Sequence, residues 1–290
     1  MIDHDQSLLA QLAEYLLPFR AAFGRRDRLP WAAVYLHGLL AAAGRKTVGR
    51  LARGADLPPN LDVEDVTQAL QNFVNQSSWD ERLVWRRHRE LIAERLADAD
   101  GLLLIEEVAF VKQGRHSVGV QRQYSSILGG KLNCQVAVAL SHAGPEGVYP
   151  LALRLYLPRG WLQDPARLDA AGVPAEQRRP QSRGTVALEL LEELRAEGWP
   201  MRPVVVGPSL ATDVLLREAL NDSSSSALPA HQQIWQERGR RQQQTLFVEL
   251  GLDNFEGRSW RGFHHHACLV MLACGFRALK WEEDALFVLA

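Results

Sequence analysis

Residues 102–107 read Leu-Leu-Leu-Ile-Glu-Glu, four apolar side chains followed directly by two carboxylates. A short, continuous apolar run of this kind predicts a buried strand over residues 102–105. Adjacent residues on a strand face opposite sides of a sheet, so only one of Glu106 and Glu107 can point into a given cleft. We expect Glu107 to be that residue and Glu106 to need a cationic or solvent partner.

The segments after this run predict the rest of a sheet. Apolar or alternating residues predict strands at 117–124, 132–141 and 148–157, with Gly129-Gly130 as the turn between the first two. A helix is expected from Thr185 to Glu197, followed by a short buried strand at 203–207. A meander of strands followed by a helix and a strand is the order of an RNase H-like core, although other α/β folds share it.

The first 98 residues have helical periodicity instead. Helices are predicted at 8–17, 31–43, 47–53, 66–74 and 79–96. Asp62 or Asp65 could cap the fourth, and Ser77 or Ser78 the fifth. We therefore predict an α/β (α+β) chain, with a helical, DNA-binding module at 1–98 and a mixed-sheet core at 99–290. A flexible break is expected near 221–230, followed by a polar helix at 231–244 and an apolar helix at 267–276.

The charge of the chain is balanced overall but uneven locally. Its 290 residues carry 33 Lys and Arg and 34 Asp and Glu, a formal charge of −1 that excludes a strongly basic protein. One cation-rich stretch contains a single acid, Asp27, among Arg20, Arg25, Arg26, Arg28, Arg45, Lys46, Arg50 and Arg53. Acids concentrate at Glu189, Glu192, Glu193, Glu197, Glu282, Glu283 and Asp284. Such a surface suits a polyanion on one side, and equally suits cations that only solvate helix faces.

The cysteines and the lack of targeting or membrane-spanning patterns predict where in the cell the protein is found. Cys134, Cys268 and Cys274 lie in apolar contexts without metal-type spacing, which is typical of reduced core residues. The N-terminus lacks the profile of a signal peptide, and no run of about 18 apolar residues could span a bilayer. We expect a cytoplasmic, nucleoid-associated protein without a membrane partner.

Four ordered motifs carry a resemblance to a known family. They are residues 114–124 (Gly-Arg-His-Ser-Val-Gly-Val-Gln-Arg-Gln-Tyr), 133–138 (Asn-Cys-Gln-Val-Ala-Val), 154–158 (Arg-Leu-Tyr-Leu-Pro) with Trp161 and Asp164-Pro165, and 251–266. Together they resemble bacterial insertion-sequence DDE transposases of the RNase H superfamily, in the cut-and-paste group whose third acid lies in a Tyr-Arg-Glu-Lys motif. Residues 35–40, 45–46 and 75–80 resemble the helical DNA-binding region of that group.

The resemblance implies three catalytic acids, Asp, Asp and Glu, that hold two divalent metal ions for strand cleavage. The first acid position reads Glu106-Glu107, and the extra methylene of glutamate displaces the carboxylate by more than about 1 Å. The second reads Gly207-Pro208, where proline offers no ligand. Counting back from Gly251 places Arg240, a cation, at the third. We therefore predict that these positions are degenerate and that no cofactor is bound.

The spacing also departs from the family. Only about thirty residues separate Pro208 from Arg240, where such transposases carry a long insertion, so the chain is internally shortened. Phosphate-contacting cations and one base-stacking ring remain as DNA-binding candidates. These candidates are Arg45, Lys46, Arg50, Arg53, Lys112, Arg115, His116, Arg122, Lys131, Arg258, Trp260 and Arg261. Trp260 could equally anchor a core, and three consecutive histidines, 264–266, cannot chelate one ion from a helix.

Three functions follow from this interpretation. The first is a domesticated, catalytically inactive transposase-like protein that binds DNA as a regulator or accessory subunit, with a protein partner or a second copy. The second is a nuclease or transposase that uses Mg²⁺ or Mn²⁺ on a rearranged acid set of Glu107, Asp213 and Glu249. The third is an interaction scaffold without DNA binding, which docks through its apolar C-terminal helices.

Overall fold

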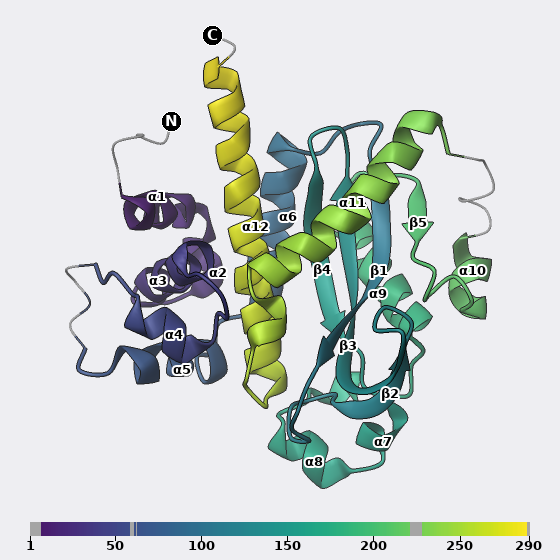
Figure 1. The fold of residues 1–290 in the computed structure, drawn as a ribbon, viewed down its shortest axis with the longest axis horizontal. Helices are drawn as coiled ribbons and strands as arrows, with labels where there is room; N and C mark the ends of the chain where they lie inside the picture. Colours follow the sequence, from purple (N-terminus) through teal and green to yellow (C-terminus); the bar gives the residue numbers. More distant parts are fainter. Residues whose placement is uncertain (1–6, 59–60, 62, 221–227, 289–290) are drawn as a thin grey trace. The chain divides into compact units, whose positions relative to one another are not determined.

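The computed structural model describes residues 7–288 except 59–60, 62 and 221–227, and describes side chains only as far as residue 279 (Figure 1). The chain forms two compact units. A helical unit comprises Met1–His88, Leu246–Gly257 and Arg261–Ala290, and a sheet unit comprises Arg89–Thr245 and Arg258–Trp260. This division does not follow the predicted boundary at 98/99, because the C-terminal segment belongs with the N-terminal helices. The predicted break at 221–230 lies mostly outside the described residues.

The helical unit is built from short amphipathic helices and the long C-terminal one. Its elements are α1 (Leu8–Tyr15), η1 (Leu17–Phe19), α2 (Arg20–Phe23), α3 (Arg28–Ala41), α4 (Val48–Arg53), α5 (Val66–Asn75), the first half of α6 (Glu81–Arg95), η3 (Leu252–Asn254) and α12 (Trp260–Val288). The side chain of Asp65 caps α5 by accepting from the backbone N–H of Gln68, as predicted. The predicted serine caps of α6 are wrong, since Asp80 accepts from the N–H of Arg82 at 2.9 Å.

The sheet unit holds five strands in the order β2-β3-β1-β5, with β4 on the free edge of β3. The strands are β1 (Leu102–Val111), β2 (Gln121–Ser125), β3 (Gly130–Ala143), β4 (Val148–Leu155) and β5 (Val204–Val206). β1, β3 and β4 pair antiparallel, whereas β5 runs parallel to β1. Both the meander and the returning parallel strand agree with the predicted RNase H-like order. β2 is shorter than predicted, because residues 117–120 form a turn in which Val120 N–H donates to Ser117 O.

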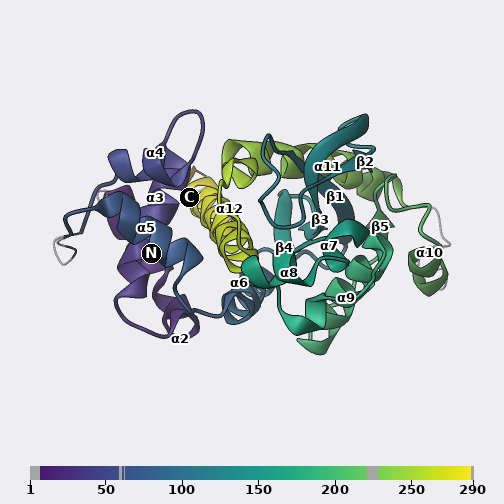
Figure 2. The ribbon, with the colours of Figure 1, turned by 90° about the horizontal axis from the view of Figure 1, so that it is seen from below.

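Helices cover both faces of this sheet. α9 (Arg183–Ala196) lies on one face, and α11 (Ala230–Glu249) crosses the other, as Figures 1 and 2 show together. At Gly239 the helix backbone comes so close to the sheet that an added Cβ would lie 2.7 Å from Leu104 Cδ1. The remaining elements of this unit are α7 (Arg159–Leu162), α8 (Pro165–Ala170), η2 (Ala175–Gln177) and α10 (Val214–Leu220).

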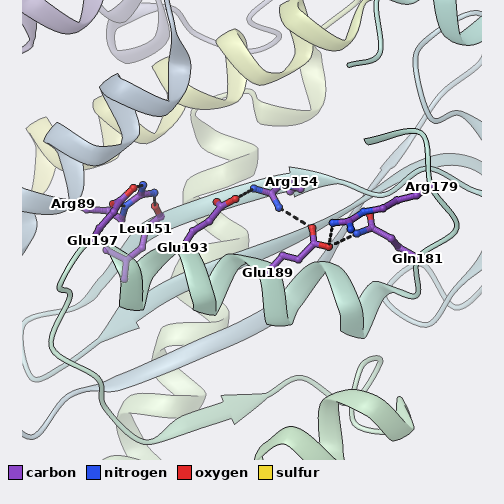
Figure 3. A network of polar contacts seen from close by, with 8 residues as sticks. All are labelled: Arg89, Leu151, Arg154, Arg179, Gln181, Glu189, Glu193 and Glu197. Carbon is purple, nitrogen blue, oxygen red and sulfur yellow. Dashed lines mark hydrogen bonds and ion pairs between the residues drawn. The ribbon is translucent and has the colours of Figure 1, made fainter. Parts of the chain in front are cut away.

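The acids of α9 form an ion-pair ladder, with Glu189, Glu193 and Glu197 spaced four residues apart on one helix face (Figure 3). Arg154 of β4 contacts Glu189 at 3.2 Å and Glu193 at 2.6 Å. Arg89 of α6 holds Glu197 with two bonds of 2.6 Å and also donates to Leu151 O at 3.0 Å. The sequence located this concentration of acids but not their partners, and each of these three has a cationic partner. Side chains at 282–284 lie outside the description.

Candidate functional site: the acid positions and a basic groove

Glu106 lies where the ends of β1 and β5 meet. Parallel pairing sets Ile105 opposite Val206, and the N–H of Gly207 donates to Ile105 O at 2.8 Å. The carboxylate of Glu106 then occupies the space beside Gly207, where an added Cβ would lie 2.0 Å from Oε2. The first two sequence-predicted acid positions, Glu106 and Gly207-Pro208, are therefore adjacent in space.

Arg240 completes this cluster from α11. Its Nε donates to Glu106 Oε1 at 2.5 Å, and its Nη2 donates to Val206 O at 3.1 Å. The side chain of Glu106 is 11% exposed and that of Arg240 is 29% exposed. Burial raises the pKa of Glu106, and the neighbouring guanidinium opposes that rise. The three positions identified in the sequence thus meet, with an ion pair between the first and the third.

Glu107 points to the other face of the sheet, so the prediction that it faces the cleft is wrong. It is fully buried, accepts from Ser125 Oγ at 2.8 Å and pairs with Arg183 Nη1 at 2.6 Å. Arg183, the first residue of α9, also donates to Tyr124 O at 3.1 Å. Glu107 therefore joins β1 to β2 and α9, and the physical reason is that α9 covers the face to which it points.

The side chains at the three positions do not fit a divalent metal ion. A cage of hard oxygen ligands needs several carboxylates, and the single one here is bound to a cation. Within the described part of the chain, no group of three or more His, Cys, Asp and Glu side chains could hold a metal. Members of the alternative acid set have separate partners. Asp213 accepts from the N–H of Gly184 and of Leu216, at 3.2 Å each, and Glu249 pairs with Arg277.

A basic groove of about 770 Å³ lies elsewhere on the sheet unit. Three arginines line it, namely Arg115, Arg122 and Arg167, together with His116 and the amides of Gln113, Gln121 and Asn133. Its one acid, Asp164, is engaged in capping α8 through the N–H of Arg167. Among the described ion pairs, none involves Arg115, His116, Arg122 or the neighbouring Lys131. A groove with unpaired cations and hydrogen-bonding amides is suited to a phosphate backbone.

Donors from the core fix the loop that carries these cations. Asn133 Nδ2 donates to Lys112 O at 2.5 Å and to Gly114 O at 3.0 Å. Gln135 Nε2 donates to Val118 O at 2.6 Å, and Trp161 Nε1 to Val120 O at 2.8 Å. Arg167 lies over the Trp161 ring, with its guanidinium carbon 3.7 Å from the centroid, and donates to Arg115 O. The groove is thus preorganised rather than a chance gathering of surface cations.

A family model described as DDE superfamily endonuclease matches residues 18–245, well over half of the chain. The chain belongs to this family. None of the curated proteins compared with it matches. Membership in the DDE superfamily establishes the RNase H-like fold of the sheet unit, and it implies an interaction with DNA, the substrate of such nucleases. No described helix is both long and apolar enough to cross a membrane.

Two DNA-binding candidates of this DDE-family chain are buried, so those predictions are wrong. Lys46 is 6% exposed and donates from Nζ to Leu39 O, and burial lowers its pKa. Trp260 is also 6% exposed, and its backbone N–H donates to Ala171 O at 2.8 Å. Both positions contribute to packing, which the sequence could not distinguish from surface roles because lysine and tryptophan occur in both settings.

The other candidates lie at separate places. Arg50 and Arg53 are exposed on the last turn of α4, and Arg45 is exposed beside Glu256 at 3.4 Å. On the sheet unit Arg258 is exposed and Lys112 is half-buried. Arg261 is exposed and donates to Gln76 O at 3.4 Å. Sequence reasoning missed Arg167 and the three amides of the groove, because long-range contacts of this kind leave no periodic signal.

The three histidines lie in the first turns of α12, where each is buried. His265 stacks on Trp79 with centroids 3.6 Å apart, and its ring nitrogens face Val74 O and Trp79 O at 2.9 and 3.0 Å. His266 Nε2 donates to Gly251 O, so its Nδ1 accepts from the Tyr35 hydroxyl, each at 2.9 Å. His265 and His266 therefore enter separate hydrogen-bond networks of the helical unit.

Proposed function

We propose that this chain is a DNA-binding member of the DDE family that has lost strand cleavage and acts as a regulator or accessory subunit of a nucleoprotein complex. One observation carries the proposal. Arg240 places its guanidinium on the carboxylate of Glu106, at the meeting point of β1, β5 and α11 where the family's acids would hold metal.

Electrostatics explain why this arrangement opposes catalysis. A two-metal site needs closely spaced anionic ligands that lack a cationic partner of their own. Here the cation at the third position already neutralises the one carboxylate present. A metal ion would have to displace a charge-assisted hydrogen bond of 2.5 Å and then face a guanidinium. Pro208, which follows Gly207 beside the carboxylate, supplies no ligand.

DNA binding is supported by the basic groove rather than by the acid positions. Arg115, His116, Arg122 and Arg167 face the groove without a free acid among them, and the loop beneath is fixed by buried donors. Phosphate contacts by several cations give affinity that falls steeply with salt. Contacts from the three arginines would give a slope of log K against log salt of roughly −2 to −3.

The cleavage half of the proposal is tested with supercoiled plasmid in Mg²⁺ or Mn²⁺. We expect no nicking above that of a Glu106→Ala variant prepared in parallel. Nicking by the wild type that disappears in Glu106→Ala would overturn the proposal in favour of a working DDE enzyme. Nicking lost in Glu107→Ala but kept in Glu106→Ala would instead support the rearranged acid set.

The binding half is tested by fluorescence anisotropy on labelled DNA between 50 and 200 mM salt. The double variant Arg115→Gln/Arg122→Gln should weaken binding and reduce the salt slope by about two. A matched control, Arg195→Gln/Arg241→Gln, removes the same charge from two exposed arginines outside the groove and should leave the slope unchanged. Wild-type protein that shows no salt-dependent binding would favour a scaffold without DNA binding. Against that scaffold, residues 267–276 are buried rather than open for docking.

A further inference from the structure

One aromatic ring next to the basic groove is largely exposed to solvent. Tyr124 on β2 is 62% exposed, whereas its neighbours Gln123 and Ser125 point inward and are buried. Antiparallel pairing sets Tyr124 directly opposite Lys131 and sets Arg122 opposite Asn133. Residues paired in this way share a face of the sheet, so the ring lies among Arg122, Lys131 and Asn133.

The groove continues onto this face. Arg122 and Asn133 line the groove and also belong to the face that carries Tyr124. Arg122 and Tyr124 are two residues apart on β2, about 7 Å along the strand, so a nucleic acid strand whose phosphates contact Arg122 would pass over the face that carries the Tyr124 ring. Lys131 across from the ring offers a further phosphate contact.

The backbone beneath the ring is held from the core. Arg183 donates to Tyr124 O at 3.1 Å while it pairs with the buried carboxylate of Glu107. Ser125, the next residue, donates from Oγ to the same carboxylate. An exposed ring on a rigid strand needs little ordering on binding, which is how stacking platforms for bases are built.

From this geometry we propose that Tyr124 is a stacking platform for an unpaired base, and that the groove takes DNA with a single-stranded or gapped segment in preference to intact duplex. The inference rests on the proposed DNA binding and specifies its substrate class. A ring on a sheet face can stack only on a base whose own face is free, and a base inside a duplex has both faces covered. The amides of Gln113 and Gln121 are placed in the groove to meet base edges that pairing leaves unused.

The test compares three labelled DNAs of equal length: a duplex, the same duplex with a two-nucleotide gap, and one single strand. We expect the wild type to bind the gapped and single-stranded forms about tenfold more tightly than the duplex, the effect of about one base–aromatic stack. Tyr124→Ala should remove that preference and leave duplex affinity and its salt slope intact. Tyr124→Trp should keep the preference.

A matched control and a second readout keep the test decisive. Ile127→Ala truncates another exposed apolar side chain of the same hairpin, 43% exposed, and should change nothing. A 2-aminopurine base in the gap should lose fluorescence on binding to wild-type protein and keep it with Tyr124→Ala. Equal affinity of the wild type for all three DNAs, with Arg115→Gln/Arg122→Gln still weakening each, would overturn the platform and leave the proposed DNA binding intact. No binding to any of the three would overturn both.

Discussion

Glu106 is largely buried and pairs with Arg240, whose charge and hydrogen bond oppose the rise in the pKa of Glu106 that burial causes. Removing one partner of such a pair leaves the other charged, desolvated and unpaired. Breaking the pair should therefore destabilise the sheet unit. The loss of unfolding free energy on breaking the pair can be compared with the loss on removing Arg241, the next residue along α11.

At this position we expect Arg240→Ala to lower the free energy of unfolding by about 3 kcal/mol. Arg241→Ala is the control, because its pair with Glu237 is exposed at both ends and should cost less than about 0.5 kcal/mol. Urea denaturation of the three proteins gives the comparison. Equal small losses in both variants would mean that the buried pair contributes nothing.

The stability that Arg240→Ala loses should depend on pH. The pKa of Glu106 is raised by burial and lowered again by Arg240, so Arg240→Ala raises it further. A carboxyl group whose pKa is raised in the folded state takes up protons on folding. Because the pKa of Glu106 is highest in Arg240→Ala, this variant loses stability relative to the wild type as the pH rises through that pKa. The difference in stability between wild type and Arg240→Ala should therefore be smallest below pH 4 and grow toward neutrality. A difference that shrinks as pH rises would contradict this explanation.

His142 should make the wild-type protein less stable as the pH falls. Its Nε2 accepts from the N–H of Asp98 at 3.2 Å, and burial lowers its pKa to about 4. The unfolded chain then binds a proton that the folded chain excludes, so stability falls as pH falls from about 6.5 to about 4. His142→Gln should flatten the pH profile in that window by up to about 1.4 kcal/mol per pH unit. Unchanged slopes in the two denaturation series would show that His142 takes up its proton at the same pH in the folded and the unfolded chain.

At the scale of elements, ion pairs as well as apolar packing connect α9 to its neighbours. Three acids spaced four residues apart meet arginines from β4 and α6 (Figure 3). Arg89 is the most buried of these cations, with a side chain that is 8% exposed. Planar, two-pronged contacts of this kind require the guanidinium shape.

We expect Arg89→Ala to cost about 3 kcal/mol, and Arg89→Lys to recover less than half of that, because an ammonium cannot make both bonds to Glu197 and the bond to Leu151 O. Arg195→Ala serves as the control, since its pair with Glu192 lies on the exposed side of the same helix. Thermal unfolding followed by circular dichroism measures all three. Full rescue by lysine would mean that only the charge matters.

Across the whole molecule, the sheet brings the three acid positions together whichever side chains they carry. The RNase H-like sheet and α11 bring residues 106, 207 and 240 together, and the carboxylate of Glu106 there is paired with Arg240. Restoring the family's residues should therefore restore a need for cations. The variant that tests this is Glu106→Asp/Pro208→Asp/Arg240→Glu.

Three clustered carboxylates repel one another, so the triple variant should unfold more easily in chelator than the wild type. Millimolar Mg²⁺ or Mn²⁺ should stabilise it by about 2–3 kcal/mol if the free ion exceeds its Kd about a hundredfold. Wild-type protein should show no such shift. A triple variant that folds but ignores both ions would mean that the three positions are too far apart to share a metal.

Much of the fold could be predicted from the sequence. Apolar runs located the strands β1, β3, β4 and β5, and the helical period located α3, α5, α9 and α11 to within a few residues. Caps were less predictable: Asp65 was among the candidates, but Asp80 was not, because several polar residues compete at each helix start. Groove residues such as Arg167 could not be found, since they are brought in by packing across about fifty residues of chain.

The sequence by itself determined that Glu106 and Glu107 face opposite sides of one strand, because side chains alternate along any strand. The order of the four motifs that resemble the family's was also readable from the sequence, as were Glu106, Pro208 and Arg240 at the positions assigned to its acids. Only the tertiary structure decided which carboxylate faces the other acid positions. That choice depends on which face α11 covers and on the pairing of Ile105 with Val206, and both arise from contacts between distant segments. The same contacts buried Lys46 and Trp260 while they left Tyr124 exposed beside the groove.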